Sequence, residues 1–338
     1  MQKVYLFGED ISRYVTEIPA IIQNKADYGQ LIINDIPSLT GENSKGFWDI
    51  SNSSSPFFGA PRLTNYKIEI EQDGEITYTG YIQSIIIENQ TRTATVNLQS
   101  TLQQLLDKKI IYESAASSTP SAIVAEICEL YQILYDTTSF GISNSIYTLD
   151  EVYICANFTN PEISILDAFQ QIAQLGIASI YSINGIVFFD VVSENSTPSI
   201  YEFTDDHDDQ DGVSILNAPL IENMEKSYTT GYSVEWAGTP IATLGLETDR
   251  GISISAGVDQ NIKILSLQAA VWIGETWMDY VQKQQRRITF QTKSRLGKNL
   301  SLGYPVSIQY RDRQLETIDI ISIDNSSKVF STITGLTR

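Results

Sequence analysis

Apolar and polar residues alternate along the first third of the chain, which is the spacing of β-strands. The clearest example is a hairpin in which Tyr66, Ile68 and Ile70 alternate with charged residues, and Asp73-Gly74 provides the tight turn. Further extended segments are predicted at residues 4–7, 10–15, 29–34 and 92–98, and a short helix at residues 101–106. Residues 1–110 are therefore predicted to form a β-rich domain.

Helical spacing replaces this alternation in the middle of the chain. Ser117-Ser-Thr-Pro120 places a hydroxyl cap before a proline at the first helical position, and an apolar stripe follows. Asn160-Pro161 is predicted to begin a second helix in the same way, and Gly176 to end it. Asn184-Gly185 is a strong signal for a hairpin. Residues 111–205 are predicted to form an α/β domain with two helices and a hairpin.

Strand-like alternation returns after about residue 205 and is interrupted by one helix. The helical face is predicted to carry Leu267, Val271, Gly274, Met278 and Val281. Strands are predicted at residues 228–236 and 252–254 and around residues 288, 306, 318 and 330. Residues 206–338 are thus predicted to be a second β domain with one helix, so the fold class is α+β, mainly β. The two β domains could be distant duplicates, although no tandem repeat demonstrates it.

The charge of the chain bears on its partners. The 338 residues carry a formal net charge of −19, which repels phosphate and makes specific DNA binding unexpected. Such a surface suits a channel through which DNA slides, and it also suits simple solubility. No apolar run reaches the ~18 residues of a membrane helix. Cys128 and Cys155 are predicted to be buried thiols of a protein folded in a reducing compartment.

Four phrases of the sequence follow one another in a recognisable order. They are the opening Asp10-Ile-Ser-Arg-Tyr-Val15, the return strand at 75–82, the helix and hairpin at 161–190, and the closing segment at 277–308. In this order they resemble the tail hub proteins of bacteriophage baseplates. The resemblance covers most of the chain, and it rests on apolar pattern and turn chemistry rather than on residues of an active site.

The resemblance implies two small β-barrel-like domains with an intervening α/β domain. Three copies would form a homotrimeric ring of six similar units that adapts a three-fold spike to the six-fold tail tube around the DNA channel. The implied partners are the tail tube or a distal tail protein and the central spike protein, with the tape measure protein as a further candidate. DNA would pass without specific binding, and membrane insertion is not expected. The implied location is the virion tail baseplate, assembled in the host cytoplasm.

The most polar run, residues 204–212, contains five aspartates and the only histidine, His207. Clustered carboxylates suit hard cations, and the weak candidate ligands are Asp205, Asp206, Asp208, Asp209 and Asp211. The spacing does not match an EF-hand loop, because the first ligand place falls on His207 and the twelfth on Ala218. A solvated loop between domains is the expected role, and no metal or cofactor is predicted.

No catalytic residue is predicted. His207 lacks the Gly-x-Ser-x-Gly elbow of a serine hydrolase, and its aspartate neighbours favour the protonated imidazole, which is a poor base. Arg286 and Arg287 are expected to flank a strand and to pair with acids at an interface. Trp272 and Trp277 lie at helical spacing, which is more typical of core than of a sugar-stacking platform.

A long polar loop is predicted at residues 41–61, where Ser, Asn, Gly and Pro are frequent. It carries the aromatic pairs Phe47-Trp48 and Phe57-Phe58. Exposed aromatic side chains often mark a contact surface. These four residues are therefore the candidates for an interaction loop that touches a neighbouring subunit.

The sequence accordingly favours a structural virion protein, a tail or baseplate hub without an enzymatic activity. Two alternatives stay open. One is a cell-wall-degrading glycoside hydrolase or peptidase of the tail tip, because the 41 acidic residues could supply a catalytic carboxylate pair. The other is a carbohydrate-binding tail-fibre protein, in which Trp48 or another loop aromatic would contact the sugar.

Overall fold

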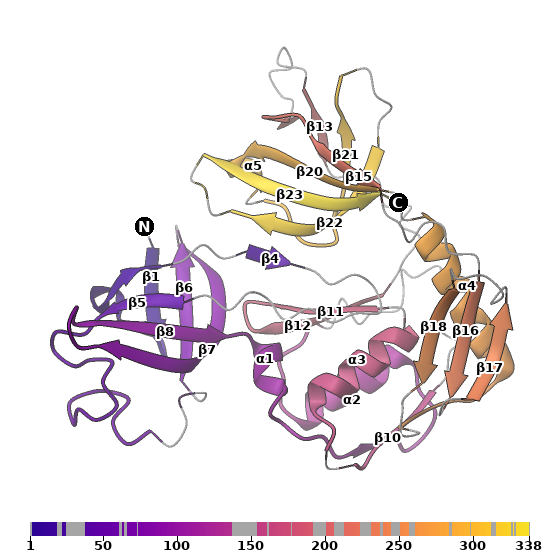
Figure 1. The fold of residues 1–338 in the computed structure, drawn as a ribbon, viewed down its shortest axis with the longest axis horizontal. Coiled ribbons are helices and arrows are strands. Elements are labelled where there is room, and N and C mark those ends of the chain that lie inside the picture. Colours follow the sequence, from indigo (N-terminus) through magenta and orange to yellow (C-terminus); the bar gives the residue numbers. More distant parts are fainter. Residues whose placement is uncertain are drawn as a thin grey trace. The chain divides into compact units, whose positions relative to one another are not determined.

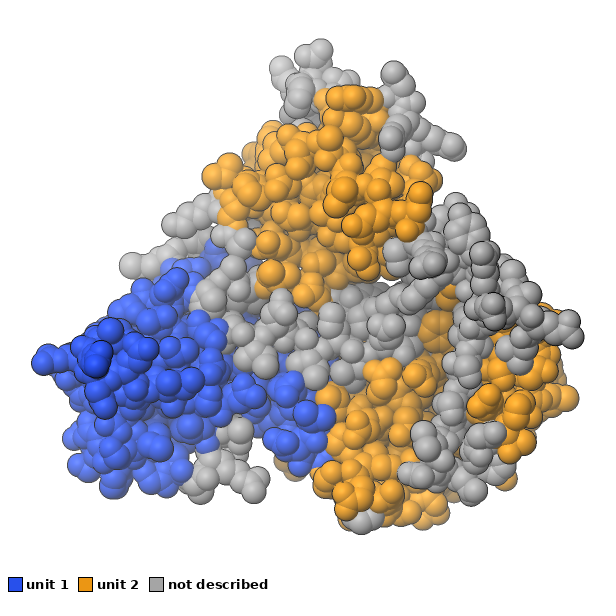
Figure 2. All heavy atoms as spheres, in the orientation of Figure 1, with its two compact units in different colours: residues 1–21, 33–108, 182–187 blue, residues 22–32, 109–181, 188–338 orange. Residues whose placement is uncertain are grey.

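The chain folds into two compact units (Figure 2). Unit 1 contains residues 1–21, 33–108 and 182–187, and unit 2 contains residues 22–32, 109–181 and 188–338. The computed structural model describes residues 2–18, 22–24, 38–60, 63, 66–72, 74–136, 154–160, 162–176, 178–191, 201–205, 213–223, 231–236, 239–244, 251–256, 261–283, 286–297, 299–311, 316–325, 327 and 329–337. The predicted division at residues 110 and 205 stays a prediction.

Unit 1 is built on one seven-stranded antiparallel sheet with the order β2-β1-β6-β7-β8-β5-β3 (Figure 1). Its strands are β1 (Gln2–Leu6), β2 (Glu9–Asp10), β3 (Val15–Glu17), β5 (Ser38–Glu42), β6 (Lys67–Gln72), β7 (Glu75–Glu88) and β8 (Thr93–Gln99). A 3₁₀ turn, η1 (Ser12–Tyr14), precedes β3, and the helix α1 (Thr101–Leu105) follows β8. The predicted hairpin and the strand after it are confirmed, with Gly74 at φ +92° in the turn.

The core of unit 1 lies on the inner face of this sheet. Alternate residues of the strands point into it, as their period of two requires, and residues of the 43–60 loop complete it. The buried residues are Val4, Leu6, Ile11, Leu39, Trp48, Phe57, Ile68, Ile70, Tyr78, Ile82, Ala94, Val96 and Leu98. A loop that was predicted to be polar and exposed therefore supplies two large side chains to the core.

Unit 2 contains a second large sheet with the order β14-β13-β21-β22-β23-β20-β15, and β4 pairs with β22 beside this path. Its strands are β13 (Tyr201–Thr204), β14 (Val213–Ser214), β15 (Leu220–Asn223), β20 (Arg286–Lys293), β21 (Pro305–Gln309), β22 (Glu316–Asp324), β23 (Phe330–Thr337) and β4 (Ile22–Asn24). The short helix α5 (Ser294–Gly297) follows β20. The strands predicted around residues 288, 306, 318 and 330 are confirmed.

Unit 2 also contains six further strands and three helices in its described part. The strands are β9 (Tyr112–Glu113), β10 (Ile154–Phe158), β16 (Gly231–Trp236), β17 (Thr239–Leu244), β18 (Gly251–Ala256) and β19 (Ile262–Ile264). The helices are α2 (Pro120–Leu130), α3 (Ile165–Gly176) and α4 (Leu267–Lys283). The sheet β19-β10-β9 and the sheet β17-β16-β18 are both three-stranded. With two large sheets and few helices, the predicted mainly-β α+β class is confirmed.

The hairpin β11 (Ala178–Ile183) and β12 (Ile186–Val191) turns at Asn184-Gly185, as predicted, with φ of +51° and +84°. Residues 182–187 at its tip belong to unit 1. There the Asn184 side-chain amide donates to the Ile76 carbonyl at 2.9 Å, and the Thr101 hydroxyl donates to the Gly185 carbonyl at 3.3 Å.

The starts of the helices α2 and α3 were both predicted from the sequence. Thr119 caps α2 and Pro120 is its first residue, as predicted. The prediction that a helix begins at Asn160-Pro161 is wrong by several residues. The helix α3 begins at Ile165, because Ser164 Oγ accepts from the Asp167 N–H at 3.0 Å while the Asp167 carboxylate accepts from the Ser164 N–H at 3.2 Å. Gly176 ends the helix, as predicted.

The helix α4 is confirmed, and its buried side coincides only partly with the apolar residues that recur at helical spacing. Leu267 is 61% exposed, whereas Ile273 and Trp277 are buried. Gly274 of the predicted face does pack against the sheet, directly under Tyr232 of β16, where an added Cβ would come within 2.1 Å of the ring. The Trp277 indole N–H donates to the Gln174 carbonyl at 2.8 Å, which fixes α4 to α3 and supports the core interpretation of this tryptophan.

The predicted strand at 29–34 lies outside the described residues. No helix in the described part of the chain is long and apolar enough to cross a membrane.

The two large sheets repeat one strand plan. In chain order, β1, β2, β3, β5, β6, β7 and β8 occupy the same places in unit 1 as β13, β14, β15, β20, β21, β22 and β23 in unit 2. The direction of one strand differs, because β1 is antiparallel to both its neighbours and β13 is parallel to both. The two large sheets thus share a strand plan, and the duplication of the two domains stays a prediction.

Candidate interaction surface

The opening phrase 10–15 crosses from one end of the unit 1 sheet to the other. The Ile11 N–H donates to the Val4 carbonyl at 2.8 Å, and the Val4 N–H donates to Ser12 Oγ at 3.0 Å. Further on, Val15 pairs with Gly41 of β5. The crossover thus hydrogen-bonds backbone groups of β1 beyond its short pairing with β2, which keeps this edge from pairing with other strands.

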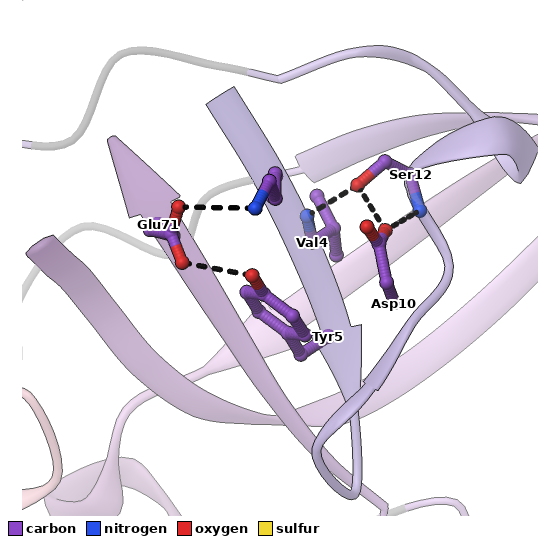
Figure 3. A network of polar contacts seen from close by, with 6 residues as sticks. Val4, Tyr5, Asp10, Ser12 and Glu71 are labelled. Atoms are coloured by element: carbon purple, nitrogen blue, oxygen red, sulfur yellow. Dashed lines mark hydrogen bonds and ion pairs between the residues drawn. The ribbon is translucent and has the colours of Figure 1, made fainter. Parts of the chain in front are cut away.

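Asp10 holds the crossover in shape. Its Oδ1 accepts from the Ser12 hydroxyl at 2.5 Å and from the Ser12 N–H at 2.9 Å (Figure 3). These hydrogen bonds favour the charged carboxylate and lower the pKa of Asp10 from its usual value, with the hydroxyl contributing most. An aspartate two residues before a serine is a local turn motif.

A second polar contact joins β1 to β6 on the outer side of the sheet. The Tyr5 hydroxyl donates to Glu71 Oε2 at 2.8 Å, and Lys3 Nζ lies 3.7 Å from Glu71 Oε1 (Figure 3). The hydrogen bond to Glu71 raises the pKa of Tyr5. An exposed ion pair of this kind contributes little to stability, so its role is to favour this register of two neighbouring strands.

The aromatic loop, residues 43–60, packs onto the crossover. Tyr14 stacks on Phe47 with ring centroids 3.7 Å apart, and the Trp48 indole N–H donates to the Tyr14 carbonyl at 3.1 Å. Trp48 stacks in turn on Phe57 with ring centroids 5.5 Å apart. Gly41 is required beneath the indole, because an added Cβ would come within 2.2 Å of Trp48 Nε1.

Hydrogen bonds within the aromatic loop hold its backbone. Asn43 Oδ1 accepts from the Trp48 N–H at 2.9 Å, and the Ser55 hydroxyl donates to the Phe47 carbonyl at 2.7 Å. The Asp49 carboxylate accepts from the Ser51 hydroxyl, which lowers the pKa of Asp49 in the same way as at Asp10. The loop is thus a built element of unit 1 with a defined outer surface.

The expectation that all four loop aromatics are exposed is wrong for two of them. Trp48 and Phe57 are fully buried and Phe47 is half-buried, whereas Phe58 is 55% exposed. Their burial follows from the stacking of Trp48 on Phe57, the contact of Phe57 with Tyr66 and the hydrogen bond from Trp48 to the Tyr14 carbonyl, which sequence spacing does not show. Ile50 is also exposed on this loop. The assignment of the loop to a subunit contact stays a prediction.

Solved structures of other proteins share the fold of this chain, although no family model matches it. No protein-family model and no curated protein matches the chain. The crystal structure of the tail protein from Neisseria meningitidis MC58 aligns with a TM-score of 0.63 at 12% identity, over 100% of this chain and 96% of that chain. The crystal structure of the 43 kDa tail protein of prophage MuSo2 from Shewanella oneidensis aligns with a TM-score of 0.59 at 12% identity, over 100% and 98%.

The chain has the fold of phage tail proteins. The resemblance drawn from four phrases of the sequence is therefore confirmed at the level of the fold. Within this tail-protein fold, the phrase 10–15 is the crossover of unit 1, and 277–308 contains the end of α4, the strand β20 and most of β21.

The remaining predicted site residues lie elsewhere in the tail-protein fold. Residues 206–212 of the acidic run, with His207, fall outside the described residues. Asp205 Oδ1 accepts from the Arg311 N–H at 3.0 Å, a structural contact. Among the described residues, no group of three or more His, Cys, Asp or Glu side chains is placed to hold a metal ion.

The arginine pair and the cysteines are only partly as predicted. Arg286 and Arg287 lie within β20 rather than beside it, and they pair with Glu316 at 2.9 Å and Glu222 at 3.7 Å. Pairing with acids is confirmed, whereas an interface at this point stays a prediction. Cys128 is buried, which raises the pKa of its thiol to about 12, but Cys155 is partly exposed, contrary to prediction.

Sequence reasoning missed the partners that make the aromatic loop a unit. Tyr14 and Tyr66 contact its rings, and Phe7, 62% exposed, contacts Tyr66 with ring centroids 5.4 Å apart. The signal that could have found them is the recurrence of aromatic residues in three segments that the predicted strands bring together. Phe7, Ile50 and Phe58 are the exposed apolar side chains of these segments.

Proposed function

We propose that the chain is a structural component of a phage tail or baseplate, and that it acts there as a hub. Three copies form a closed ring, which accepts a spike protein on one side and seats the tail tube or a distal tail protein on the other. The fold of two tail proteins over the whole chain supports the coarse part of this proposal.

One observation carries the finer part. Two sheets of the same strand plan occur in one chain, so three chains carry six copies of that plan. A three-fold ring of such chains offers six similar surfaces to a six-fold partner and three identical surfaces to a three-fold partner. A chain with only one such sheet would offer three surfaces to both partners and would not adapt one symmetry to the other.

The α/β elements between the two sheets form the third part of the proposed hub. We assign the domains as 1–110, 111–205 and 206–338, with the first and the last forming the ring. In this assignment three short segments fold with another part of the chain: β4 pairs with β22, the tip of the β11–β12 hairpin belongs to unit 1, and β13 pairs with β14 and β21 of the last domain.

The aromatic loop is the proposed contact surface of unit 1 in the ring. Its rings are anchored by Trp48 and Phe57, while Phe58 and Ile50 remain exposed on a backbone fixed by hydrogen bonds. A pre-formed loop loses little conformational entropy on binding, which favours a stable contact. The net charge of −19 would let DNA pass the ring without binding it.

The mass of the purified chain in solution tests this proposal. We expect the mass of three chains at micromolar concentration, and particles with three-fold symmetry in electron micrographs. Phe58→Asp should weaken the trimer without unfolding the chain, because this side chain is exposed. A chain that remains a monomer at all concentrations, alone and with its tail partners, would refute the hub.

We propose no catalytic reaction for the chain. Incubation with purified peptidoglycan and release of soluble fragments is the relevant assay, and no release above the buffer blank is expected. Release that disappears when a single acidic residue is neutralised would instead establish the cell-wall hydrolase alternative. Binding of a polysaccharide that is lost on changing an exposed loop aromatic would establish the tail-fibre alternative.

A further inference from the structure

The middle strands of the two sheets, β7 and β22, carry the same short sequence at the same place. Ile82-Gln-Ser-Ile85 in β7 corresponds to Ile320-Ile-Ser-Ile323 in β22. In both strands the pairing with the next strand shifts by one residue immediately before the serine, between Ile82 and Ser84 and between Ile320 and Ser322. A bulge of this kind marks a conserved position within a repeated plan, so residues 84–86 of unit 1 are equivalent to residues 322–324 of unit 2.

In unit 2 both edges of the segment after the bulge are paired. One edge of β22 pairs with β23. The other edge pairs first with β21, at residues 316–319, and then with β4, at residues 322–324. The Ser322 hydroxyl also donates to Asn24 Oδ1 at 2.6 Å. A strand of this same chain therefore covers the part of β22 that β21 does not reach.

In unit 1 the equivalent segment has a strand on one edge only. β8 pairs with Ser84–Glu88, whereas the pairing of β6 ends at Tyr81, with one further hydrogen bond from the Ile82 N–H to the Tyr66 carbonyl. Among the residues that the structure describes, no strand pairs with the other edge of Ser84–Glu88. Within the described part of the chain, the alternate N–H and C=O groups on that side of Ser84–Glu88 therefore have no strand partner.

The residues along this edge of β7, Ser84–Glu88, are more apolar than those of a typical protected edge strand. Ile85, Ile86 and Ile87 follow one another, and Ile86 is 55% exposed. Natural edge strands usually carry charges, proline or a covering segment, because an apolar edge pairs readily with another strand. Unit 1 covers its other end with the Asp10–Ser12 crossover. The exception at Ser84–Glu88 therefore points to a use for this edge.

We propose that the edge of β7 at Ser84–Glu88 is a docking site for a strand from a second copy of this chain. The occupant is argued from unit 2, where the equivalent edge takes a strand of this same sequence, β4. Backbone hydrogen bonds give such strand addition its affinity. This inference rests on the proposed self-assembly and names one surface through which it occurs. A head-to-tail contact of this kind closes into a ring when its rotation allows.

Two substitutions in the full-length chain test the docking site. Ile86→Lys places a charge on the open edge, and Leu130→Lys places the same charge on an equally exposed residue (59%) of the helix α2. The association constant from sedimentation should fall at least about tenfold for Ile86→Lys, as expected from losing one or more backbone hydrogen bonds. Leu130→Lys should associate like the unchanged chain.

Hydrogen exchange supplies a second measurement that does not depend on a variant. The amides of residues 84–88 that point away from β8 should exchange slowly in the oligomer and rapidly after dilution to monomer. Equal protection in the monomer would mean that another segment of the same chain covers the edge, and this result would overturn the inference. So would an Ile86→Lys chain that assembles normally, while the proposed hub would still stand. A chain that never associates would overturn both.

Discussion

The two large sheets share a strand plan but fill their cores differently. In unit 1 the largest buried side chains come from the aromatic loop, where Trp48 stacks on Phe57. In the second large sheet they come from the strands themselves, where Phe203 of β13 and Phe290 of β20 lie edge to face with ring centroids 4.9 Å apart. A sheet topology therefore needs a core of suitable volume and does not dictate which segment provides it.

The one strand that differs in direction shows how connections decide topology. Phe7 and Gly8, with φ of +51° and +84°, join β1 to β2 as a tight hairpin, which makes them antiparallel. In unit 2 the acidic run, residues 205–212, joins β13 to β14, and the two strands are parallel. A parallel pair requires a longer connection than a two-residue turn.

Trp48→Ala should have the largest effect, because it removes the centre of the unit 1 core. The side chain is fully buried, and truncation of a buried tryptophan costs about 3–5 kcal/mol of unfolding free energy. Calorimetry should show a transition of unit 1 at much lower temperature while the transition of unit 2 is retained. Phe58→Ala, ten residues away on the same loop and exposed, is the control and should change the unfolding free energy little.

A Trp48→Ala chain as stable as the unchanged one would contradict the comparison between the two cores. It would mean that the aromatic loop lies on the sheet without completing its core. The matched change in unit 2, Phe290→Ala, should destabilise that unit by about 3–5 kcal/mol through its strand residue.

If β7 and β22 are equivalent, the same substitution at matching positions should lower the unfolding free energy of each unit by a similar amount. Ile82 and Ile320 immediately precede the two bulges, and both are fully buried. Ile82→Ala and Ile320→Ala should each lower the unfolding free energy of their own unit by about 2–5 kcal/mol. Denaturant unfolding of the two variants provides the measurement. A change at one position that costs several times more than at the other would break the equivalence.

Local patterns predicted the hairpins β6–β7 and β11–β12 because a hairpin depends on alternation and on its turn. Gly74 and Asn184-Gly185 adopt the positive φ that such turns require, so sequence alone located both hairpins. Thr119 and Pro120 likewise marked the start of α2. These features are decided within a few residues, which is the range that a sequence pattern covers.

Features decided by distant residues were missed. The burial of Trp48 depends on Tyr14 and Gly41, and the strand β4 exists because it pairs with β22, some 300 residues later in the chain. The sequence left open whether the two β domains are duplicates, although Ile-x-Ser-Ile occurs in both middle strands. Four residues are too short a repeat to stand out from an apolar pattern, and only the shared bulge gives them meaning.

Ser322→Ala tests the strand that covers β22. The change removes the hydroxyl that donates to Asn24 Oδ1, and a single hydrogen bond of this kind contributes about 1 kcal/mol. The amides of residues 22–24 should exchange faster, because a three-residue strand has few other contacts to hold it. The control is Ser84→Ala, the equivalent serine of unit 1, which accepts from the Asn97 side chain and should leave exchange at 22–24 unchanged. Unchanged exchange in Ser322→Ala would show that this contact does not hold β4.

The smallest expected effect is a difference in how the stability of the two crossovers depends on pH. In unit 1 the Ser12 hydroxyl and N–H lower the pKa of Asp10 below its ordinary value of 3.8. The contribution of Asp10 to stability is therefore complete above pH 3.8 and is lost as the pH falls through the lowered pKa of the folded state. In unit 2 the corresponding crossover is the segment 215–219 between β14 and β15, where Asn217 Oδ1 accepts from the Gln291 N–H at 3.1 Å. An amide does not titrate in this range.

Carboxyl NMR titration of the folded chain measures this difference directly. Ser12→Ala should raise the pKa of Asp10 toward 3.8, because the hydroxyl that contributes most to its lowering is gone. Asp49, which is lowered by Ser51 in the aromatic loop, serves as the internal control and should keep its low pKa. If Asp10 titrates alike in both chains, the hydroxyl does not stabilise its carboxylate, and the two crossovers then differ in sequence without differing in their response to acid.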